Sequence, residues 1–366
     1  MTTLAFFHVS GIMMWTIVNI HGQWRCFVGR VPLRLRIPCA KYTGYAQGSI
    51  ELARRLRDDK RIVLEVLASN NNVPDYLLQD IKDMIVSVPR LGWLGVLIGF
   101  PPALPSLGTK YKIIYTMYET DDVPETWRGY VTRADEIWVP SQHCAKVFGK
   151  YNRRIRIIPF GYNEKLFKRD VGRPRKQRGD FRFGSVGVMS KRKGVDVLVR
   201  AFSAAFPLKR NVSLTIKTRN TRWLPEIDDE RIHLIDTDWE SEQLVEFYHD
   251  IDCLVQPSRG EGVGLPQLEA AACGTPVITT NWSGPVDYID DNGIYGLMVS
   301  KMVPAENMLT KKARWAEPNI GHLVHLMKQA YNGELQVSGN YKAFSVGNMA
   351  VLFSKAIIET WRRIKT

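Results

Sequence analysis

Apolar runs with the spacing of β-strands alternate along this chain with amphipathic stretches of helical spacing, and the alternation occurs twice. The first round begins at residues 33–39 and the second at residues 181–186. Strands that alternate with helices predict parallel sheets covered by helices. We therefore expect an α/β protein with two doubly wound domains that face a cleft, and a C-terminal helix that packs across both domains.

The chain is long enough for two domains, because its 366 residues compare with about 100–200 residues in a typical domain. Residues 165–182 are rich in Lys and Arg and contain glycine and proline, so they are the best candidate for a linker. We place the boundary near residues 160–180. The expected units are an N-terminal extension of unclear role (1–30), an N-terminal domain (31–165), a C-terminal domain (166–345) and a terminal helix (346–366).

Several elements of the first half are predicted from apolar spacing and from turn residues. We expect strands at residues 33–39 and 62–67, a loop at 42–48, helices at 49–56 and 80–86, and loop or short pieces at 92–108. Ser141 is a candidate helix N-cap, because its hydroxyl can accept a hydrogen bond from a free amide.

The chain is basic, with 50 Lys and Arg against 37 Asp and Glu and a net charge of +13. Such a balance favours an anionic partner, which leaves a nucleotide, an anionic membrane face or nucleic acid open, as well as a scattered surface charge without a partner. The five cysteines are scattered and show no metal-binding spacing, so we expect no metal site and a reducing, cytoplasmic location. Residues 1–24 lack charged side chains, and membrane association of this stretch stays open.

The segment 258–277, which reads SRGEGVGLPQLEAAACGTPV, contains the residues that most directly indicate a ligand-binding site. Gly260, Gly262 and Gly264 let the backbone approach a ligand closely. Pro266 suits the first helical position, and Gly274 suits the helix end. We therefore expect a short helix whose N-terminal amides can bind oxyanions or hydroxyls. Glu261 and Glu269 add acceptors for sugar hydroxyls, and the basic residues at 191–193 can face phosphates. A nucleotide sugar combines these groups.

This segment resembles the donor-binding signature of the retaining GT-B glycosyltransferases of the large group-one family. Glu261 and Glu269 match its paired glutamates, which have seven residues between them. Residues 281–287 (NWSGPVD), 158–163 (IPFGYN) and 42–56 are also similar to that family, as is Lys193-Gly194. The resemblance covers about residues 33–300. It implies two Rossmann-like domains and the transfer of a sugar from a nucleotide-diphosphate sugar to a hydroxyl, with retention of configuration and without a metal or other cofactor.

The resemblance also implies roles for individual residues. Glu269 would hold the donor ribose, Glu261 would contact the donor sugar, and Lys193 would neutralise the leaving diphosphate. Other donor-side positions are Gly187, Lys191, Arg192, Gly262 and the amides of Val263, Gly264 and Leu265, with His233 near the base. On the acceptor side the positions are Gly44, Tyr45 and Glu119.

Two departures from the family pattern matter. Many relatives place an arginine directly after the glycine that starts the phosphate loop, whereas here Val188 follows Gly187. Lys191 or Arg192 is expected to supply that charge. Some relatives carry a histidine where this chain has Glu119, which would orient or deprotonate the acceptor hydroxyl, or simply be a solvated or helix-capping carboxylate.

Three functions stay open at this point. The first is glycosyl transfer to an unknown acceptor, which includes a glycan, a lipid, a protein or a modified base in DNA. The second is another enzyme of the same fold, such as a nucleotide-sugar epimerase or a phosphorylase. The third is a basic nucleic-acid-binding protein, although the chain has no RNA-recognition, zinc-finger or helix-turn-helix signature.

Overall fold

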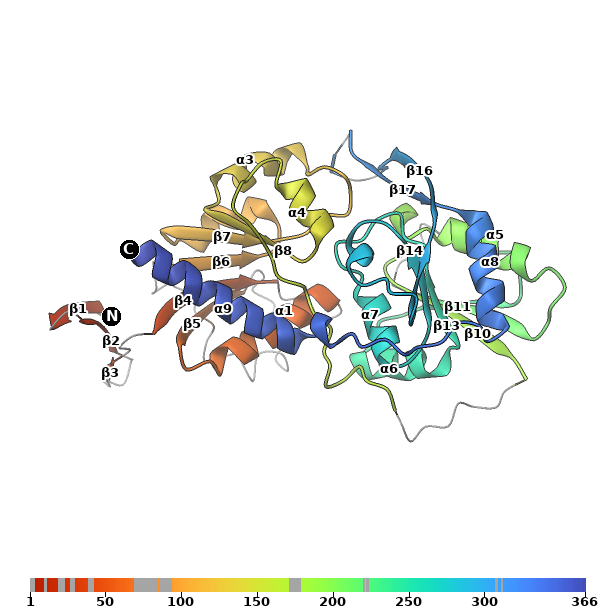
Figure 1. Ribbon diagram of the computed structural model, residues 1–366, viewed down its shortest axis with the longest axis horizontal. Helices are drawn as coiled ribbons and strands as arrows, with labels where there is room; N and C mark the ends of the chain where they lie inside the picture. Colours follow the sequence, from red (N-terminus) through yellow and green to blue (C-terminus); the bar gives the residue numbers. More distant parts are fainter. Residues whose placement is uncertain are drawn as a thin grey trace.

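The computed structural model describes residues 30–38, 43–68, 85, 94–170, 179–219, 221, 224–306, 309–310 and 312–366, and the backbone of strands 4–9, 12–18 and 24–26. Two six-stranded sheets form its centre, one in each half of the chain. Figure 1 shows the two sheets side by side, with helices packed against them. The expectation of an α/β protein with two doubly wound domains is confirmed.

The N-terminal sheet has the strand order β5-β4-β6-β7-β8-β9, and its neighbouring strands all run parallel. Its strands are β4 (Val31–Ile37), β5 (Ile62–Ala68), β6 (Leu94–Ile98), β7 (Tyr111–Tyr115), β8 (Glu136–Val139) and β9 (Ile155–Ile157). The helices around it are α1 (Gly44–Arg57), η2 (Pro101–Leu107), α3 (Glu125–Arg133) and α4 (Gln142–Phe148). All five residues of β6 are buried, as in a strand that is covered on both faces.

The C-terminal sheet is also parallel, with the order β12-β11-β10-β13-β14-β15. Its strands are β10 (Phe181–Val186), β11 (Val212–Thr218), β12 (Ile232–Asp236), β13 (Cys253–Gln256), β14 (Val277–Thr280) and β15 (Ile294–Leu297). Its helices are η3 (Lys191–Lys193), α5 (Val195–Ala205), α6 (Ser241–Asp250), α7 (Leu265–Ala272), η4 (Gly284–Asp287) and α8 (Ile320–Tyr331). The strand order reverses between β10 and β13, and such a reversal opens a crevice at the carboxyl ends of the strands.

Local sequence explains several of these elements. Val195, Leu198 and Phe202 lie on one face of α5, and all three are buried. The predicted N-cap at Ser141 is confirmed, because its hydroxyl accepts a hydrogen bond from the Cys144 amide at 3.3 Å.

Two smaller antiparallel sheets complete the described part of the chain. Strands β1 (Leu4–Val9), β2 (Ile12–Val18) and β3 (Trp24–Cys26) form one near the N-terminus. Strands β16 (Val299–Pro304) and β17 (Arg314–Pro318) form the other, a hairpin between β15 and α8. No helix in the described part of the chain has the length and apolar character that a membrane span requires.

The C-terminal segment returns from the second domain to the first. The Tyr341 hydroxyl hydrogen-bonds to Asp290 of the C-terminal domain at 3.0 Å, just before η5 (Lys342–Phe344). Helix α9 (Val346–Lys365) then packs on α1 and β4 (Figure 1). Its Phe353 ring contacts the rings of Tyr115 and Trp138. The segment as a whole therefore contacts both domains, while the helix itself lies mainly on the N-terminal one.

Some predicted elements of the first half differ from the structure. The loop expected at 42–48 is wrong from Gly44 onward, because α1 already begins there and Thr43 caps it through a hydrogen bond from the Ala46 amide. Gly44 and Gly48 near the start of α1 led to the prediction of a loop, since glycine disfavours helix interiors. The loop or short pieces expected at 92–108 include two short elements, β6, where Gly95 packs against Leu107, and η2. The helix expected at 80–86 and residues 171–178 of the expected linker lie outside the described residues, apart from Ile85.

Candidate active site

Two loops meet where the strand order of the C-terminal sheet reverses. Residues 187–194 follow β10, residues 257–264 follow β13, and these two strands are neighbours. Ligands of open parallel sheets bind outside the carboxyl ends of the strands at such a point. The two loops that the sequence singles out therefore border the same crevice.

The loop before α7 borders this crevice, and its backbone conformation depends on Gly264. Gly264 has φ +87°, a conformation that favours glycine, and a Cβ at this position would meet the Tyr288 hydroxyl. Tyr288 donates a hydrogen bond to the carbonyl of Val263 at 2.6 Å, and its hydroxyl also lies 3.2 Å from the carbonyl of Gly264. Within the described residues, the amides of Val263, Gly264 and Leu265 have no acceptor. The start of α7 is therefore free to bind an anion or a hydroxyl.

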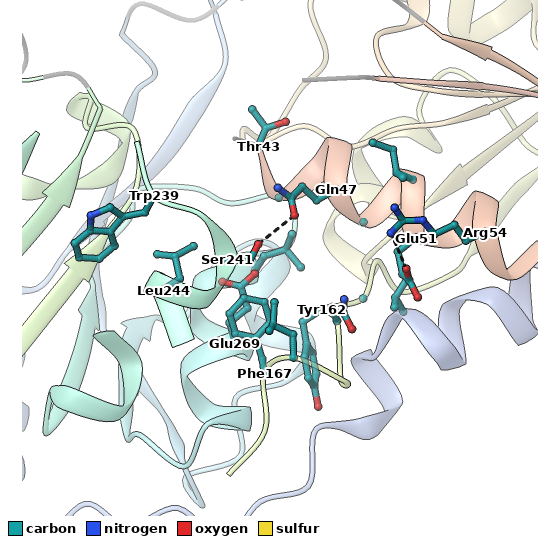
Figure 2. Close-up of a pocket in the computed structure, with 18 residues that line it drawn as sticks. Thr43, Gln47, Glu51, Arg54, Tyr162, Phe167, Trp239, Ser241, Leu244 and Glu269 are labelled. Carbon is teal, nitrogen blue, oxygen red and sulfur yellow. Dashed lines mark hydrogen bonds and ion pairs between the residues drawn. The ribbon is translucent and has the colours of Figure 1, made fainter. Parts of the chain in front are cut away.

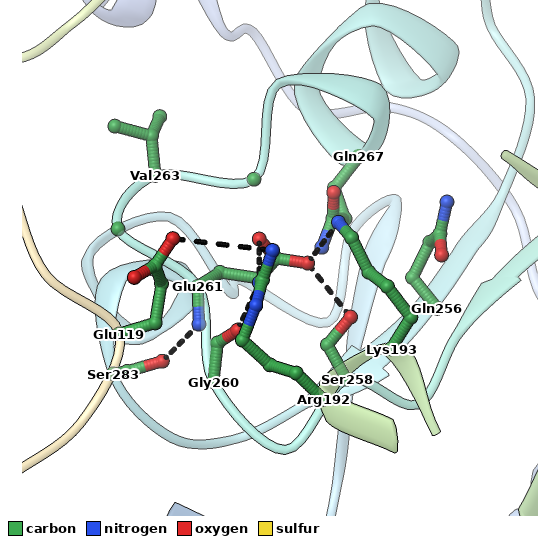
Figure 3. Close-up of polar contacts among 12 residues, drawn as sticks. Glu119, Arg192, Lys193, Gln256, Ser258, Gly260, Glu261, Val263, Gln267 and Ser283 are labelled. Atoms are coloured by element: carbon green, nitrogen blue, oxygen red, sulfur yellow. Dashed lines mark hydrogen bonds and ion pairs between the residues drawn. The ribbon is translucent and has the colours of Figure 1, made fainter. Parts of the chain in front are cut away.

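Glu261 lies at the centre of an ion-pair network, which Figure 3 shows. Its carboxylate accepts hydrogen bonds from Lys193 Nζ at 2.6 Å, from Arg192 at 3.0 Å and from Ser258 Oγ at 2.7 Å. Burial by itself would raise the pKa of Glu261, but Lys193 and Arg192 outweigh this effect and hold that pKa at about 2. Glu261 is therefore a fixed anion beside two cations.

The basic run at 191–193 points in two directions. Arg192 faces the crevice, where it also donates to the Gly260 carbonyl at 2.6 Å and lies 3.9 Å from the carboxylate of Glu119. Lys191 turns away and pairs with Glu306 at 2.5 Å. Of the two candidates for the missing phosphate-loop arginine, Arg192 is the one that reaches the crevice.

The other glycines of these loops allow close packing. A Cβ on Gly187 would lie 3.3 Å from Cε of Lys193, so this glycine leaves room for the lysine. A Cβ on Gly262 would lie 2.5 Å from Sδ of Met117, which belongs to the facing domain. Gly262 thus allows the two domains to approach each other at the site.

Glu269 lines a cavity of about 110 Å³ between the two domains (Figure 2). The carboxylate of Glu269 is 8% exposed and accepts a hydrogen bond from the Tyr248 hydroxyl at 2.9 Å. Burial raises the pKa of Glu269 to about 7, and the Tyr248 hydrogen bond opposes this rise. Across the cavity, Ser241 donates a hydrogen bond to Gln47 of α1 at 3.1 Å, so both domains contribute to its wall.

On the acceptor side, the structure brings two of the three predicted residues to the cleft. Glu119 follows β7 and approaches Arg192, as described above. Gly44 lines the cavity, where a Cβ would lie 2.9 Å from Cδ1 of Leu265. Tyr45 does not line this cavity: its hydroxyl donates to the Tyr115 carbonyl at 3.3 Å, and its ring packs against Phe160 of its own domain.

His233 lies away from the crevice. It is the second residue of β12 and lines a groove with Asp180 and Arg182, which lie at the opposite edge of the sheet. The carboxyl end of β12 is Asp236. The structure therefore gives no support to a contact of His233 with the donor base, because its position in the strand is too early to reach the carboxyl edge.

Several residues of the site carry no signal in the sequence. Trp239 and Ser241 line the cavity, yet nothing in their local sequence sets them apart. Arg259 stands within the glycine-rich segment and is 3% exposed, paired with Asp196 at 2.7 Å and Glu317 at 2.6 Å. The sequence contains this arginine but does not indicate its distant partners.

Among the described residues, no group of three or more His, Cys, Asp or Glu side chains is arranged to hold a metal ion. Cys144, Cys253 and Cys273 are buried free thiols. Burial raises the pKa of Cys144 to about 11, so this thiol stays protonated near neutral pH.

A comparison with known families matches most of the C-terminal domain to one family model. Residues 180–312 match the family model described as "Glycosyl transferases group 1". This stretch contains both loops of the crevice and both glutamates. The stretch is therefore similar to the group 1 glycosyl transferases. The D-inositol 3-phosphate glycosyltransferase of Acidothermus cellulolyticus is 27% identical over 234 residues, which are 56% of this chain and 52% of that protein. The chain thus spans about half the length of this curated relative.

Solved structures extend the likeness to both domains. Sucrose-phosphate synthase from Thermosynechococcus elongatus superposes with a TM-score of 0.66 at 16% identity, over 91% of this chain and all of that one (100%). Anabaena HepE, solved in complex with UDP and glucose, superposes with a TM-score of 0.63 at 13% identity, over 90% of this chain and 100% of that one. At this identity the likeness concerns the fold, and it confirms the expected GT-B architecture.

Proposed function

We propose that this chain is a glycosyltransferase that moves a sugar from a nucleotide-diphosphate sugar to a hydroxyl of an acceptor, with retention of configuration and without a metal ion. The observation that carries the proposal is the arrangement at the switch point of the C-terminal sheet. There, Lys193, Arg192 and the open amides before α7 adjoin the buried carboxylate of Glu269 on that helix and Glu119 from the facing domain.

The donor fits this arrangement group by group. Its diphosphate would lie at the start of α7, where the amides of Val263 to Leu265 and the cations Lys193 and Arg192 all favour negative charge. Its ribose would hydrogen-bond to Glu269 in the cavity between the domains. Trp239 lines the same cavity and offers a ring for the base. HepE, which shares the fold, was solved with UDP and glucose, in keeping with such a donor.

The proposed reaction has one bond breaking and one bond forming at the anomeric carbon. The bond from this carbon to the diphosphate oxygen breaks, and its electron pair leaves with the diphosphate. The acceptor oxygen bonds to the carbon, and its proton passes to the carboxylate of Glu119. Lys193 and Arg192 would stabilise the charge that grows on the diphosphate, which is the main electrostatic task of such a site. Glu261, ionised at neutral pH, would stabilise positive charge on the sugar ring.

The stereochemical part of the proposal rests on the resemblance of segment 258–277 to the retaining family. Glu261 is held in ion pairs with Lys193 and Arg192, which supports an electrostatic role for this carboxylate. We also propose that the protein is located in the cytoplasm. We place the limits of its domains near residues 165 and 345.

A panel of nucleotide sugars tests the donor. Each compound is added to the purified full-length chain, and the thermal unfolding temperature is measured, because a ligand that binds only the folded state raises it. The compound that stabilises the chain is then incubated with candidate acceptors, and release of the nucleoside diphosphate is followed with and without EDTA. The anomeric configuration of the product is read by NMR.

The outcomes separate the alternatives. Diphosphate release that depends on an acceptor and survives EDTA, with a product of unchanged anomeric configuration, supports the proposal. Conversion of the sugar without any acceptor would indicate an epimerase, and dependence on inorganic phosphate would indicate a phosphorylase. If no nucleotide sugar stabilises the chain, the proposal is wrong.

A further inference from the structure

The loop that carries Glu119, residues 116–124, is attached to other parts of the chain close to this residue. Arg314 of β17 donates through its amide to the Asp121 carboxylate at 2.7 Å, and the Arg314 guanidinium pairs with the same carboxylate at 3.1 Å. The β16–β17 hairpin is therefore fixed two residues after Glu119. Further contacts lie nearer still, at the carbonyl of Glu119 and at that of the next residue.

His143 on α4 makes one of these contacts, and its ring also meets the facing domain. Nε2 of His143 lies 3.1 Å from the carbonyl oxygen of Thr120. Burial lowers the pKa of His143 to about 4, against the opposing effects of the Thr120 carbonyl and Asp121, so the ring is neutral near pH 7. A carbonyl oxygen can only accept a hydrogen bond, so Nε2 carries the proton and donates it to Thr120.

Trp282 connects His143 with the loop at 257–264. The His143 and Trp282 rings meet edge to face, with their centroids 4.9 Å apart. A Cβ on Gly260 would lie 3.0 Å from the Trp282 ring and would overlap the carbonyl oxygen of Glu119. Only a glycine at this position lets the two loops pack so closely. Trp282, Gly260 and the Glu119 backbone thus form one continuous contact between the domains.

The residue after Trp282 holds the donor side of the same junction. Ser283 Oγ accepts a hydrogen bond from the Glu261 amide at 2.9 Å. Arg192 donates to the Gly260 carbonyl at 2.6 Å and lies 3.9 Å from the Glu119 carboxylate, which Figure 3 shows directed toward it. The segment 282–283 therefore contacts both the loop that presents Glu261 and, through Gly260 and His143, the loop that presents Glu119.

The position of the Glu119 carboxylate matters because a general base must lie within hydrogen-bond reach of the proton that it takes. A displacement of about 1 Å in such a group can lower a rate about 10²-fold. The Glu119 side chain is 26% exposed, so it is open to an acceptor and is not fixed by burial alone. Its position depends on the backbone that His143 and Gly260 hold.

We propose that His143 and Trp282 are positioning residues for the transfer reaction. His143 fixes the Thr120 carbonyl, and Trp282 presses Gly260 against the Glu119 carbonyl. Together they hold the Glu119 carboxylate where it takes the proton of the acceptor hydroxyl. This inference rests on the proposed glycosyl transfer and adds to it two residues that act through Glu119 rather than on the substrates.

A double-mutant cycle tests the proposal. His143→Phe keeps a ring beside Trp282 but loses the hydrogen-bond donor, whereas His143→Gln keeps an N–H donor in the place of Nε2. Both changes are made in the wild type and in Glu119→Gln, and Trp282→Leu is made in the same two backgrounds as a second variant from the other domain. His325→Phe is the control, because His325 is exposed on α8.

Each protein is assayed with the nucleotide sugar that most stabilises the wild type and with a panel of p-nitrophenyl glycosides, sugar phosphates and inositol phosphates. If no member of the panel reacts, hydrolysis of the donor is followed instead, since water must also lose a proton. Thermal unfolding shows that each variant is folded, and donor titration gives its donor affinity.

We expect kcat to fall about 10-fold in His143→Phe and in Trp282→Leu, in line with the loss of one contact that orients the base. Donor affinity in His143→Phe should stay at the wild-type value, and His143→Gln should keep most of the wild-type kcat. In Glu119→Gln, which itself should lower kcat about 10²–10⁴-fold, neither change should lower kcat by more than about 2-fold. The control should match the wild type.

Other outcomes overturn the inference and leave the proposed function in place. Equal losses of kcat with and without the Glu119 carboxylate would show that His143 and Trp282 only stabilise the interface. An unchanged kcat in both single variants, or in Glu119→Gln, would contradict the positioning role. A wild-type chain that binds no nucleotide sugar would instead contradict the proposed function itself.

Discussion

Glu261 and Glu269 belong to one short segment, yet their surroundings give them opposite acid strengths. Lys193 and Arg192 face Glu261 and overcome the effect of burial, so its pKa is held at about 2. Glu269 is equally buried, and among the described residues its side-chain hydrogen-bond partner is the Tyr248 hydroxyl, so burial raises its pKa to about 7. Glu261 is suited to balancing fixed positive charge, and Glu269 is suited to exchanging hydrogen bonds with a sugar hydroxyl.

The raised pKa of Glu269 predicts a pH dependence of stability. Between its usual pKa of 4.5 and the folded value of about 7, the unfolded chain has lost the proton that the folded chain keeps. The contribution of Glu269 to the free energy of unfolding should therefore be complete below pH 4.5 and decline as the pH rises to about 7. Urea denaturation of wild type and Glu269→Gln at several pH values checks this. A difference between the two proteins that does not vary with pH would contradict it.

Glu269→Gln and Lys193→Ala should affect different steps. We expect the first to weaken donor binding about 10-fold or more, because a hydrogen bond to a charged group contributes about 1.5–3 kcal/mol. We expect the second to lower kcat about 10²–10³-fold, the usual cost of removing one group that stabilises transition-state charge. Donor titration and initial rates measure the two effects. Wild-type transfer rates in both variants would refute the site assignment.

At the scale of elements, Arg259 holds three parts of the C-terminal domain together. Its guanidinium pairs with Asp196 at the start of α5 and with Glu317 of β17, and it donates to the Lys191 carbonyl at 2.5 Å. Its own backbone belongs to the loop that presents Glu261. The position of this loop therefore depends on a side chain that is turned away from the crevice.

Arg259→Ala should destabilise the domain and weaken donor binding without removing any proposed donor contact. We expect a loss of about 3 kcal/mol in the free energy of unfolding, the lower end for a broken buried ion pair, because Asp196 and Glu317 are partly exposed. Chemical denaturation and donor titration measure both effects. Arg210→Ala is the control, since the Arg210–Glu230 pair is exposed, and it should behave as the wild type. Equal behaviour of the two variants would contradict the role of Arg259.

At the scale of the molecule, the two domains touch on both sides of the candidate site. Gly262 packs on Met117, Asp287 accepts a hydrogen bond from the Gln142 amide at 2.9 Å, and Ser241 bonds to Gln47. The C-terminal segment adds a second connection, because α9 returns to the N-terminal domain and packs on α1. The end of the chain thus completes the core of the domain in which the chain begins.

Phe353→Ala tests this role of α9. The Phe353 ring is fully buried against Tyr115 and Trp138, so its removal should cost about 3–5 kcal/mol in the free energy of unfolding. Val351→Ala on the same helix is the control, because Val351 is 66% exposed and should change little. Urea denaturation measures both. A loss in the free energy of unfolding below about 1 kcal/mol in Phe353→Ala would show that α9 contributes little to this core.

Much of this architecture could be predicted from local pattern, and the failures have physical causes. The strand at Phe181–Val186 and the cap at Ser141 depend on residues close in sequence, and both were predicted correctly. The start of α1 at Gly44 was missed because two glycines disfavour a helix that tertiary contacts nevertheless stabilise. The position of His233 early in β12 could not be predicted, because its distance from the end of the strand depends on strand register.

The sequence by itself determined the two rounds of strand and helix, the glycine-rich turn before α7 and the presence of Glu261, Glu269 and Lys193, because these depend on spacing and on residue type. Only the tertiary structure decided that Arg192 rather than Lys191 faces Glu261, that burial separates the acid strengths of the two glutamates, and that the β16–β17 hairpin lies beside Glu119. These features arise from contacts between residues far apart in the chain, where burial and charge depend on the packing of both domains.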